Sequence, residues 1–161
     1  MRRTRSAGAA VGLILLVVPL SGGCGGGDEP FPLNLPCQAL SEKEVGEQTG
    51  VAVTGRSSRV IDPTVYVCEW TAAGGSDYLV RLRTQNSTAM VTLDATLYGH
   101  SELPSLGEGG SQALSMDGAI RTVEAVRHGQ SLSLQCRLEG TDWADDGCVK
   151  LAKLVAARMQ D

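Results

Sequence analysis

Several residues and patterns that often mark a function are scarce in this sequence of 161 residues. It has only two histidines, His100 and His128, and no cysteines spaced C-x-x-C, so the usual zinc-site patterns are missing. Aromatic residues make up 4% of the chain, which leaves Val, Leu and Ala to form most of the core. The longest apolar run, residues 9–20, is about a dozen residues long, whereas a membrane-spanning helix needs about 20. We therefore expect neither a metal site nor a membrane-spanning helix.

Basic residues are also in short supply. The chain has 18 acidic and 14 basic residues, and three of the basic ones, Arg2, Arg3 and Arg5, lie at its very start. Nucleic acids and anionic membrane surfaces favour partners with basic patches. The acidic remainder of the chain is therefore not expected to bind nucleic acid.

The N-terminal region has the layout of a lipoprotein export signal. The three arginines precede the apolar run, which ends in Leu20-Ser21-Gly22-Gly23-Cys24. A basic start, a short apolar core and small residues before a cut site are typical of secretory signals. Ser21 departs from the usual pattern, which has a large aliphatic residue three positions before the cysteine. We predict that residues 1–23 are removed and that Cys24 receives lipid; the alternative is plain secretion, with Cys24 as an odd thiol.

The other four cysteines form an even set. In an oxidising compartment, Cys37, Cys68, Cys136 and Cys148 are expected to form two disulfides. Four cysteines allow three pairings, and we favour Cys37–Cys68 with Cys136–Cys148, because each then links a helix or its entry to a strand nearby in sequence. Residues 24–36, rich in Gly and Pro, are predicted to be a flexible tether, and residues 37–161 a single domain.

The mature chain reads as an α+β domain. Ser41 and Glu44 form a capping-box pattern for a helix over residues 42–49, which Gly50 ends. Alternating or turn-bounded apolar segments predict strands over residues 51–54, 65–71, 78–84, 112–116, 119–126 and 130–138. Helical spacing predicts further helices over residues 87–97 and from Asp145 to the C-terminal end. The expected fold is an antiparallel sheet with helices packed on one face.

Candidate ligand-binding residues are few. Arg81 and Arg83 share the outward face of one predicted strand, where they could bind an anionic envelope ligand or simply form a solvated face paired with acids. Trp70 lies on an inward face beside Cys68, which fits core packing as well as a ligand platform. His100 and His128 fall in predicted turns and are interpreted as solvated. No catalytic residue is assigned.

A glycine-rich stretch could be mistaken for a phosphate-binding loop. The stretch, Gly107-Glu108-Gly109-Gly110, lacks the Lys-Ser/Thr ending of such loops, and its acid would repel phosphate. We interpret it as a plain loop and expect no cofactor.

A set of shared motifs spans about residues 36–160: Pro36-Cys37-x-x-Leu40-Ser41 with Glu44-Val45 and Gly50, Cys68-x-Trp70, a Pro-x-Leu-Gly loop at 104–107, and paired late cysteines before a C-terminal helix. In these motifs the chain resembles a family of actinobacterial lipoproteins classed as domain of unknown function 3558. The resemblance implies an exported, membrane-anchored protein and brings no family activity with it.

These observations predict a lipid-anchored lipoprotein on the outer face of the cytoplasmic membrane. We expect a non-enzymatic domain that binds or scaffolds an envelope protein, glycan or lipid. The alternative is a carrier or sensor of an apolar or lipid ligand held between sheet and helices.

Overall fold

The computed structural model describes residues 31–75, 77–87, 98–138, 141, 143, 144 and 146–159. The seven strands that it describes form one sheet in the order β1-β2-β3-β7-β6-β5-β4, and every neighbouring pair is antiparallel. The strands are β1 (Val53–Asp62), β2 (Val65–Ala72), β3 (Tyr78–Gln85), β4 (Tyr98–Glu102), β5 (Glu108–Leu114), β6 (Ile120–Arg127) and β7 (Gln130–Arg137). The helices are α1 (Glu42–Thr49), α2 (Gly147–Arg158) and the 3-10 turns η1 (Pro36–Gln38) and η2 (Pro104–Leu106). The predicted α+β class with an antiparallel sheet is confirmed.

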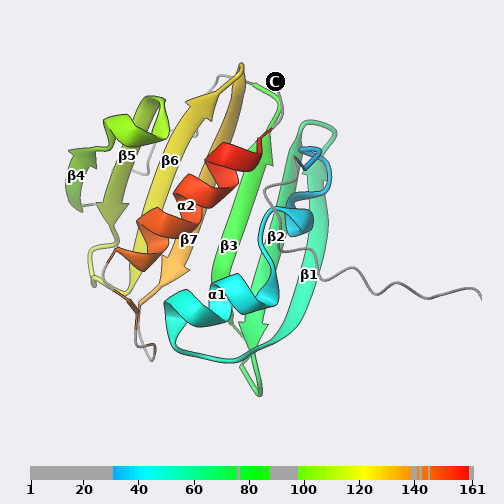
Figure 1. Ribbon diagram of the computed structural model, residues 1–161, viewed down its shortest axis with the longest axis vertical. Helices are drawn as coiled ribbons and strands as arrows, with labels where there is room; N and C mark the ends of the chain where they lie inside the picture. The colour runs from blue at the N-terminus through cyan, green and yellow to red at the C-terminus, as the bar shows by residue number, and fades with distance from the viewer. Residues whose placement is uncertain are drawn as a thin grey trace, which may run out of the picture.

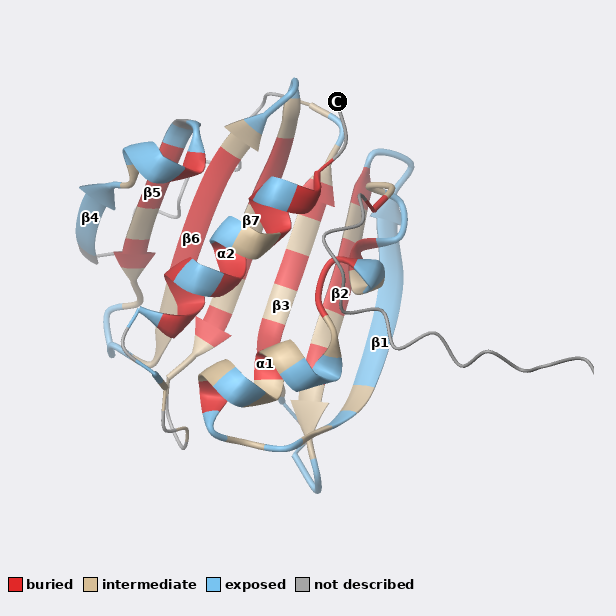
Figure 2. Cartoon of the chain, in the orientation of Figure 1, coloured by how far each residue is buried: buried red, intermediate tan, exposed pale blue. Residues whose placement is uncertain are grey.

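Both α-helices are drawn on the viewer's side of the sheet in Figure 1, where α2 crosses in front of β6 and β7. Alternation along the strands explains the core beneath them. Cys68, Leu82, Leu134 and Val123 are successive partners across β2, β3, β7 and β6, and all four are fully buried. Figure 2 shows this burial as bands across the central strands. Among the described residues, no helix is both long and apolar enough to span a membrane.

Helix α1 forms as its sequence predicts. The Ser41 hydroxyl accepts a hydrogen bond from the Glu44 backbone N–H, and the Glu44 carboxylate accepts one from the Ser41 N–H. This reciprocal pair satisfies backbone donors that the first helical turn leaves open. Gly50 ends the helix in the left-handed conformation, at a φ of 67°.

The N-terminal strap, residues 31–40, corrects the predicted extent of the tether. Phe31 is 1% exposed, forms a parallel bridge with Met159 and donates its N–H to the Arg158 carbonyl at 3.0 Å. Leu40, at the other end of the strap, is also buried. Residues 31–36 therefore belong to the domain, because apolar side chains in this stretch find places in the core that their Gly- and Pro-rich context does not reveal.

Strand β1 is longer than the sequence predicts. The sequence predicts a strand over residues 51–54 only, whereas β1 continues through residues 55–58 and ends at Asp62. β1 is an edge strand that is exposed along most of its length (Figure 2), with Val60 and Ile61 64% and 57% exposed.

The helix predicted over residues 87–97 lies outside the described residues, apart from Ser87.

Candidate functional site

Four of the five cysteines are joined in two disulfides. Cys37 pairs with Cys68 at a Cα–Cα distance of 5.1 Å, and Cys136 with Cys148 at 6.0 Å, the two pairings that the sequence analysis favours. Cys24 lies outside the described residues. The two disulfides suggest an oxidising, extracytoplasmic location.

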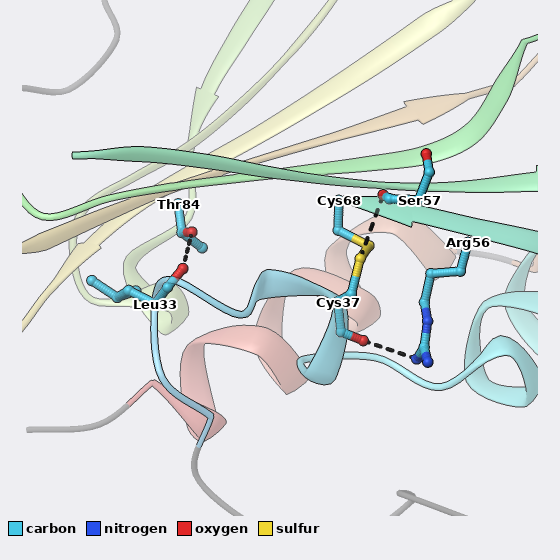
Figure 3. The surroundings of a disulfide bond; sticks show 6 residues. All are labelled: Leu33, Cys37, Arg56, Ser57, Cys68 and Thr84. Carbon is cyan, nitrogen blue, oxygen red and sulfur yellow. Dashed lines mark hydrogen bonds between the residues drawn. A yellow bond between two sulfur atoms is a disulfide. The ribbon is translucent and has the colours of Figure 1, made fainter. Parts of the chain in front are cut away.

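The Cys37–Cys68 bridge fastens the N-terminal strap to the sheet. Around it, the Thr84 hydroxyl donates a hydrogen bond to the Leu33 carbonyl at 2.8 Å (Figure 3). The Arg56 guanidinium donates to the Cys37 carbonyl at 3.0 Å. The strap is thus held by one covalent bond and by side chains from β1 and β3.

Trp70 is part of the core and not a surface for ligands. It is 0% exposed, next to the disulfide half Cys68, and its Cα partner on β3 is Val80, which is equally buried. A fully buried ring offers a ligand no face to stack on. Of the two readings open to the sequence, the structure supports core packing.

Arg81 is already occupied by neighbours on the sheet. Its Nε lies 2.6 Å from the Glu69 carboxylate, and its guanidinium stacks 3.9 Å above the ring of Tyr78. A second arginine, Arg59, reaches the same carboxylate at 3.2 Å. Arg81 therefore fits the solvated, acid-paired face that the sequence allows, and its guanidinium is already paired within the protein.

Arg83 shares the face of Arg81 but belongs to a different cluster. Across the sheet, Glu102, Ser111, Glu124, Ser133 and Arg83 are successive Cα partners on β4, β5, β6, β7 and β3. We call these five residues the polar row. Because neighbouring residues of a strand point to opposite faces, the polar row lies on the face opposite Leu82 and Leu134 and away from the core.

The middle of the polar row is buried. Ser111 and Glu124 are each 4% exposed, and neither the Ser111 hydroxyl nor the Glu124 Oε2 has a hydrogen-bond partner. Burial raises the pKa of the Glu124 carboxyl, against the opposing effects of a hydrogen bond with Ser133 and the charge of Arg83. Polar groups buried this deeply normally have hydrogen-bond partners.

At its β4 end the polar row opens into a hollow of about 450 Å³ between the edge strands and η2. We call it the β4–β5 hollow; its described lining residues are His100, Glu102, Pro104, Gly107, Gly109, Gly110 and Ser111. A neighbouring hollow of about 540 Å³ on the other side of η2 is lined by Val126, Arg127 and His128, among others.

Close packing of the backbone shapes the rim of the β4–β5 hollow. The Leu103 N–H donates to the Gly110 carbonyl at 2.7 Å. A side chain at Gly110 would collide with the Leu103 carbonyl, so only glycine fits there. The glycine-rich stretch read as a plain loop is thus partly strand, since β5 begins at Glu108.

Sequence reasoning considered His100 only as a loop residue. In the structure His100 lies on β4, exposed, two positions from Glu102, and both residues line the β4–β5 hollow. Ser111 is the direct Cα partner of Glu102 and not of His100, and no hydrogen bond joins the His100 ring to the Ser111 hydroxyl. The hollow therefore gathers an imidazole, a carboxylate and a hydroxyl without aligning them as a catalytic triad.

No protein-family model and no curated protein matches this sequence. The arrangement of the described residues therefore carries the functional argument.

Proposed function

We propose that the chain is a lipid-anchored lipoprotein of the cell envelope, with a non-enzymatic binding or scaffolding domain outside the cytoplasmic membrane whose helices pack on one face of the sheet. The observation that carries the proposal is the use of the cysteines. Cys37, Cys68, Cys136 and Cys148 are paired, which leaves Cys24 as the remaining cysteine of the five. Cys24 follows an apolar run and the small residues Gly22 and Gly23, which fit the two positions before a lipoprotein cut site, although Ser21 departs from the usual pattern. The motifs shared with domain of unknown function 3558 agree with this proposal.

The docked strap gives the anchor a short reach. Since Phe31 is already buried against the domain, no more than the stretch from Cys24 to Phe31 can separate the lipid from folded protein. Fully extended, they span about 25 Å. The domain is then held close to the headgroups, as a scaffold at the membrane surface requires.

A binding role is better supported than transport of an apolar ligand. The space between helices and sheet is filled by side chains such as Trp70, Leu134 and Leu151, which are fully buried. The two hollows described above lie instead at the β4–β5 end of the sheet, outside the space between helices and sheet, and their linings mix polar residues and glycines with apolar residues such as Pro104, Leu106 and Val126. The geometry of His100 and Ser111 likewise favours binding over hydrolysis.

Cys24→Ala tests the anchor. The variant is expected to move from the membrane pellet to the soluble fraction, because the lipid-bearing thiol is gone, whereas wild-type protein stays in the pellet until detergent is added. Cys37→Ala with Cys68→Ala serves as the matched control, since it removes cysteines without touching the predicted lipid site. Retention of the Cys24→Ala protein in the pellet would disprove lipid anchoring.

A further inference from the structure

Strand β1 leaves one edge of the sheet open. It is ten residues long and pairs only with β2 among the described strands, so its other side has no strand to bond. The opposite edge strand, β4, has five residues. Proteins usually protect an edge by keeping it short, by placing proline in it or by covering it. β1 is long, contains no proline and is exposed along most of its length (Figure 2).

The middle of β1 is regular enough to accept a further strand. From Gly55 to Val60 its residues pair with β2 in unbroken register, and the two irregularities lie between Val53 and Gly55 and between Val60 and Asp62. An extended peptide adds to such an edge through main-chain hydrogen bonds, and its side chains determine which peptides bind. β1 therefore offers the backbone half of a strand-addition site.

Two arginines give this edge a surplus of positive charge. Arg56 donates to the Cys37 carbonyl, and it forms no ion pair within the described part of the chain. Arg59 shares the Glu69 carboxylate with Arg81, so two guanidiniums face one acid. Carboxylates on an added strand would pair with this surplus through charge-assisted hydrogen bonds.

The same charges argue against a second copy of this chain as the added strand. Two β1 strands side by side would bring Arg56 and Arg59 of both copies to one seam, and like charges opposite each other destabilise a strand pair. The acid at the end of β1, Asp62, already accepts two hydrogen bonds from Thr64 within its own turn. The edge thus selects an acidic partner over a copy of itself.

We infer that β1 binds an extended acidic segment of another protein as an additional antiparallel strand. Arg56 and Arg59 lie three residues apart and on opposite faces of the sheet, so the segment needs two acids with the same spacing, one for each face. Val60 and Ile61, both exposed, add apolar contacts beside them. This inference names a partner class for the binding role proposed above, and it rests on that role.

A synthetic peptide tests the inference. Val-Val-Glu-Thr-Thr-Glu, antiparallel to β1, places its valines opposite Ile61 and Val60 and its glutamates opposite Arg59 and Arg56. The fluorescein-labelled peptide is titrated with mature full-length protein in detergent, and fluorescence anisotropy measures the affinity. A peptide with Lys in place of both Glu is expected to bind about tenfold more weakly. Hydrogen exchange is expected to slow at the β1 amides and to stay unchanged at β4.

Variants test the charge contacts. Arg56→Gln and Arg59→Gln are each expected to weaken binding about threefold, and the double variant about tenfold, as exposed ion pairs at separate positions add. Arg127→Gln removes an exposed arginine from β6, away from this edge, and is expected to leave the affinity unchanged.

N-methylated peptides test the main-chain contacts. Successive residues of a strand direct their N–H groups to opposite edges, and only one edge of the peptide can pair with β1. Of two peptides N-methylated on the odd or on the even residues, one is therefore expected to lose binding and the other to keep it.

The inference is overturned if the peptide does not bind, if the lysine peptide binds as well, if the two N-methylation patterns act alike, or if the double arginine variant binds as wild type does. β1 amides already protected in the protein alone would show an occupied edge, as in a dimer, and would overturn it too. The peptide comparisons use wild-type protein, so they decide even if a variant fails to fold. Failure here would leave the Cys24 fractionation result untouched, and a soluble wild-type protein would leave the peptide titration untouched, so the two proposals fail separately.

Discussion

Glu44→Gln is expected to destabilise the domain although it changes only one oxygen to an amide nitrogen. Arg158 donates to the two carboxylate oxygens of Glu44 at 2.7 and 3.2 Å and to the Ala39 carbonyl at 2.7 Å. The side chains of Arg158 and Glu44 are 7% and 19% exposed. The pair ties the start of α1 to the end of α2, and the same carboxylate caps Ser41.

The size of the expected loss of stability follows from the hydrogen bonds that remain in the Glu44→Gln variant. Removing one partner of a fully buried ion pair costs about 3–5 kcal/mol. Here the Ala39 bond remains, and Gln keeps one carbonyl acceptor, so we expect a loss of about 2 kcal/mol in the free energy of unfolding. Urea titration followed by circular dichroism measures it as a lower midpoint with an unchanged slope.

The pH dependence gives a second readout. Burial raises the pKa of Glu44, but hydrogen bonds with Arg158 and Ser41 outweigh it and hold the pKa below its ordinary value. A depressed carboxyl pKa adds stability above the ordinary pKa, and this is lost as the pH falls through the folded-state pKa. The difference between wild type and Glu44→Gln should therefore shrink on acidification.

The same helix offers a matched control for this prediction. Glu47 pairs with Lys43 at 3.7 Å, but their side chains are 59% and 84% exposed. Exposed pairs of this kind contribute about 0–1 kcal/mol. If Glu44→Gln costs no more than Glu47→Gln at neutral pH, the reasoning about the buried pair is refuted.

Two further predictions concern the disulfides and the polar row. Replacing Cys136 and Cys148 by Ala should lower the unfolding free energy by about 3 kcal/mol, and replacing Cys37 and Cys68 by Ala should lower it by about 4 kcal/mol. The bridges span 12 and 31 residues, and closing the longer loop removes more entropy from the unfolded chain. The reverse order of the two stability losses in urea titrations would contradict this prediction. Glu124→Gln should stabilise the domain at neutral pH and not in acid. Burial raises the pKa of Glu124, so keeping this carboxyl ionised in the folded protein costs stability above the ordinary glutamate pKa. A lower melting temperature for this variant than for wild type at neutral pH would show that the carboxylate is stabilising instead.

Much of the fold could be predicted because it is encoded by local patterns. The α1 helix follows from Ser41, Glu44 and Gly50, three residues that act within one short segment. The strand predicted over residues 130–138 matches β7 to within one residue, because its apolar residues face the core at every second position. The favoured disulfide pairings also follow from predicted helices and strands, because each bridge links a helix or its entry to a strand nearby in sequence.

The features of the fold that the sequence does not predict depend on contacts between distant segments. The predicted strand over residues 51–54 is shorter than β1, because an exposed edge strand needs no alternation of apolar residues to keep its position in the sheet. Local spacing likewise does not reveal that Arg158 is buried: it is 6% exposed, because the acid that pairs with it comes from α1.

The candidate site could not be read from the sequence for a similar reason. Ser111 and Glu124 lie on different strands, and Glu102 reaches them from the far edge of the sheet. Only the pairing register brings the three side chains into one line, and register is set by contacts across the whole sheet. The sequence indicates only weakly that His100 lies on a strand, because β4 is short and follows residues 88–97.

The position of the Cys37–Cys68 bridge has a mechanical consequence. A pull on the proposed membrane anchor reaches Phe31 and, after only a few more residues, the covalent bond from Cys37 to β2, the strand beside the edge strand β1. Tension then passes from Cys37 directly into β2, and the loop between them, which contains α1 and β1, bears no load. Under drag at the envelope, the segment that would peel most easily, the exposed edge strand, is bypassed by the force.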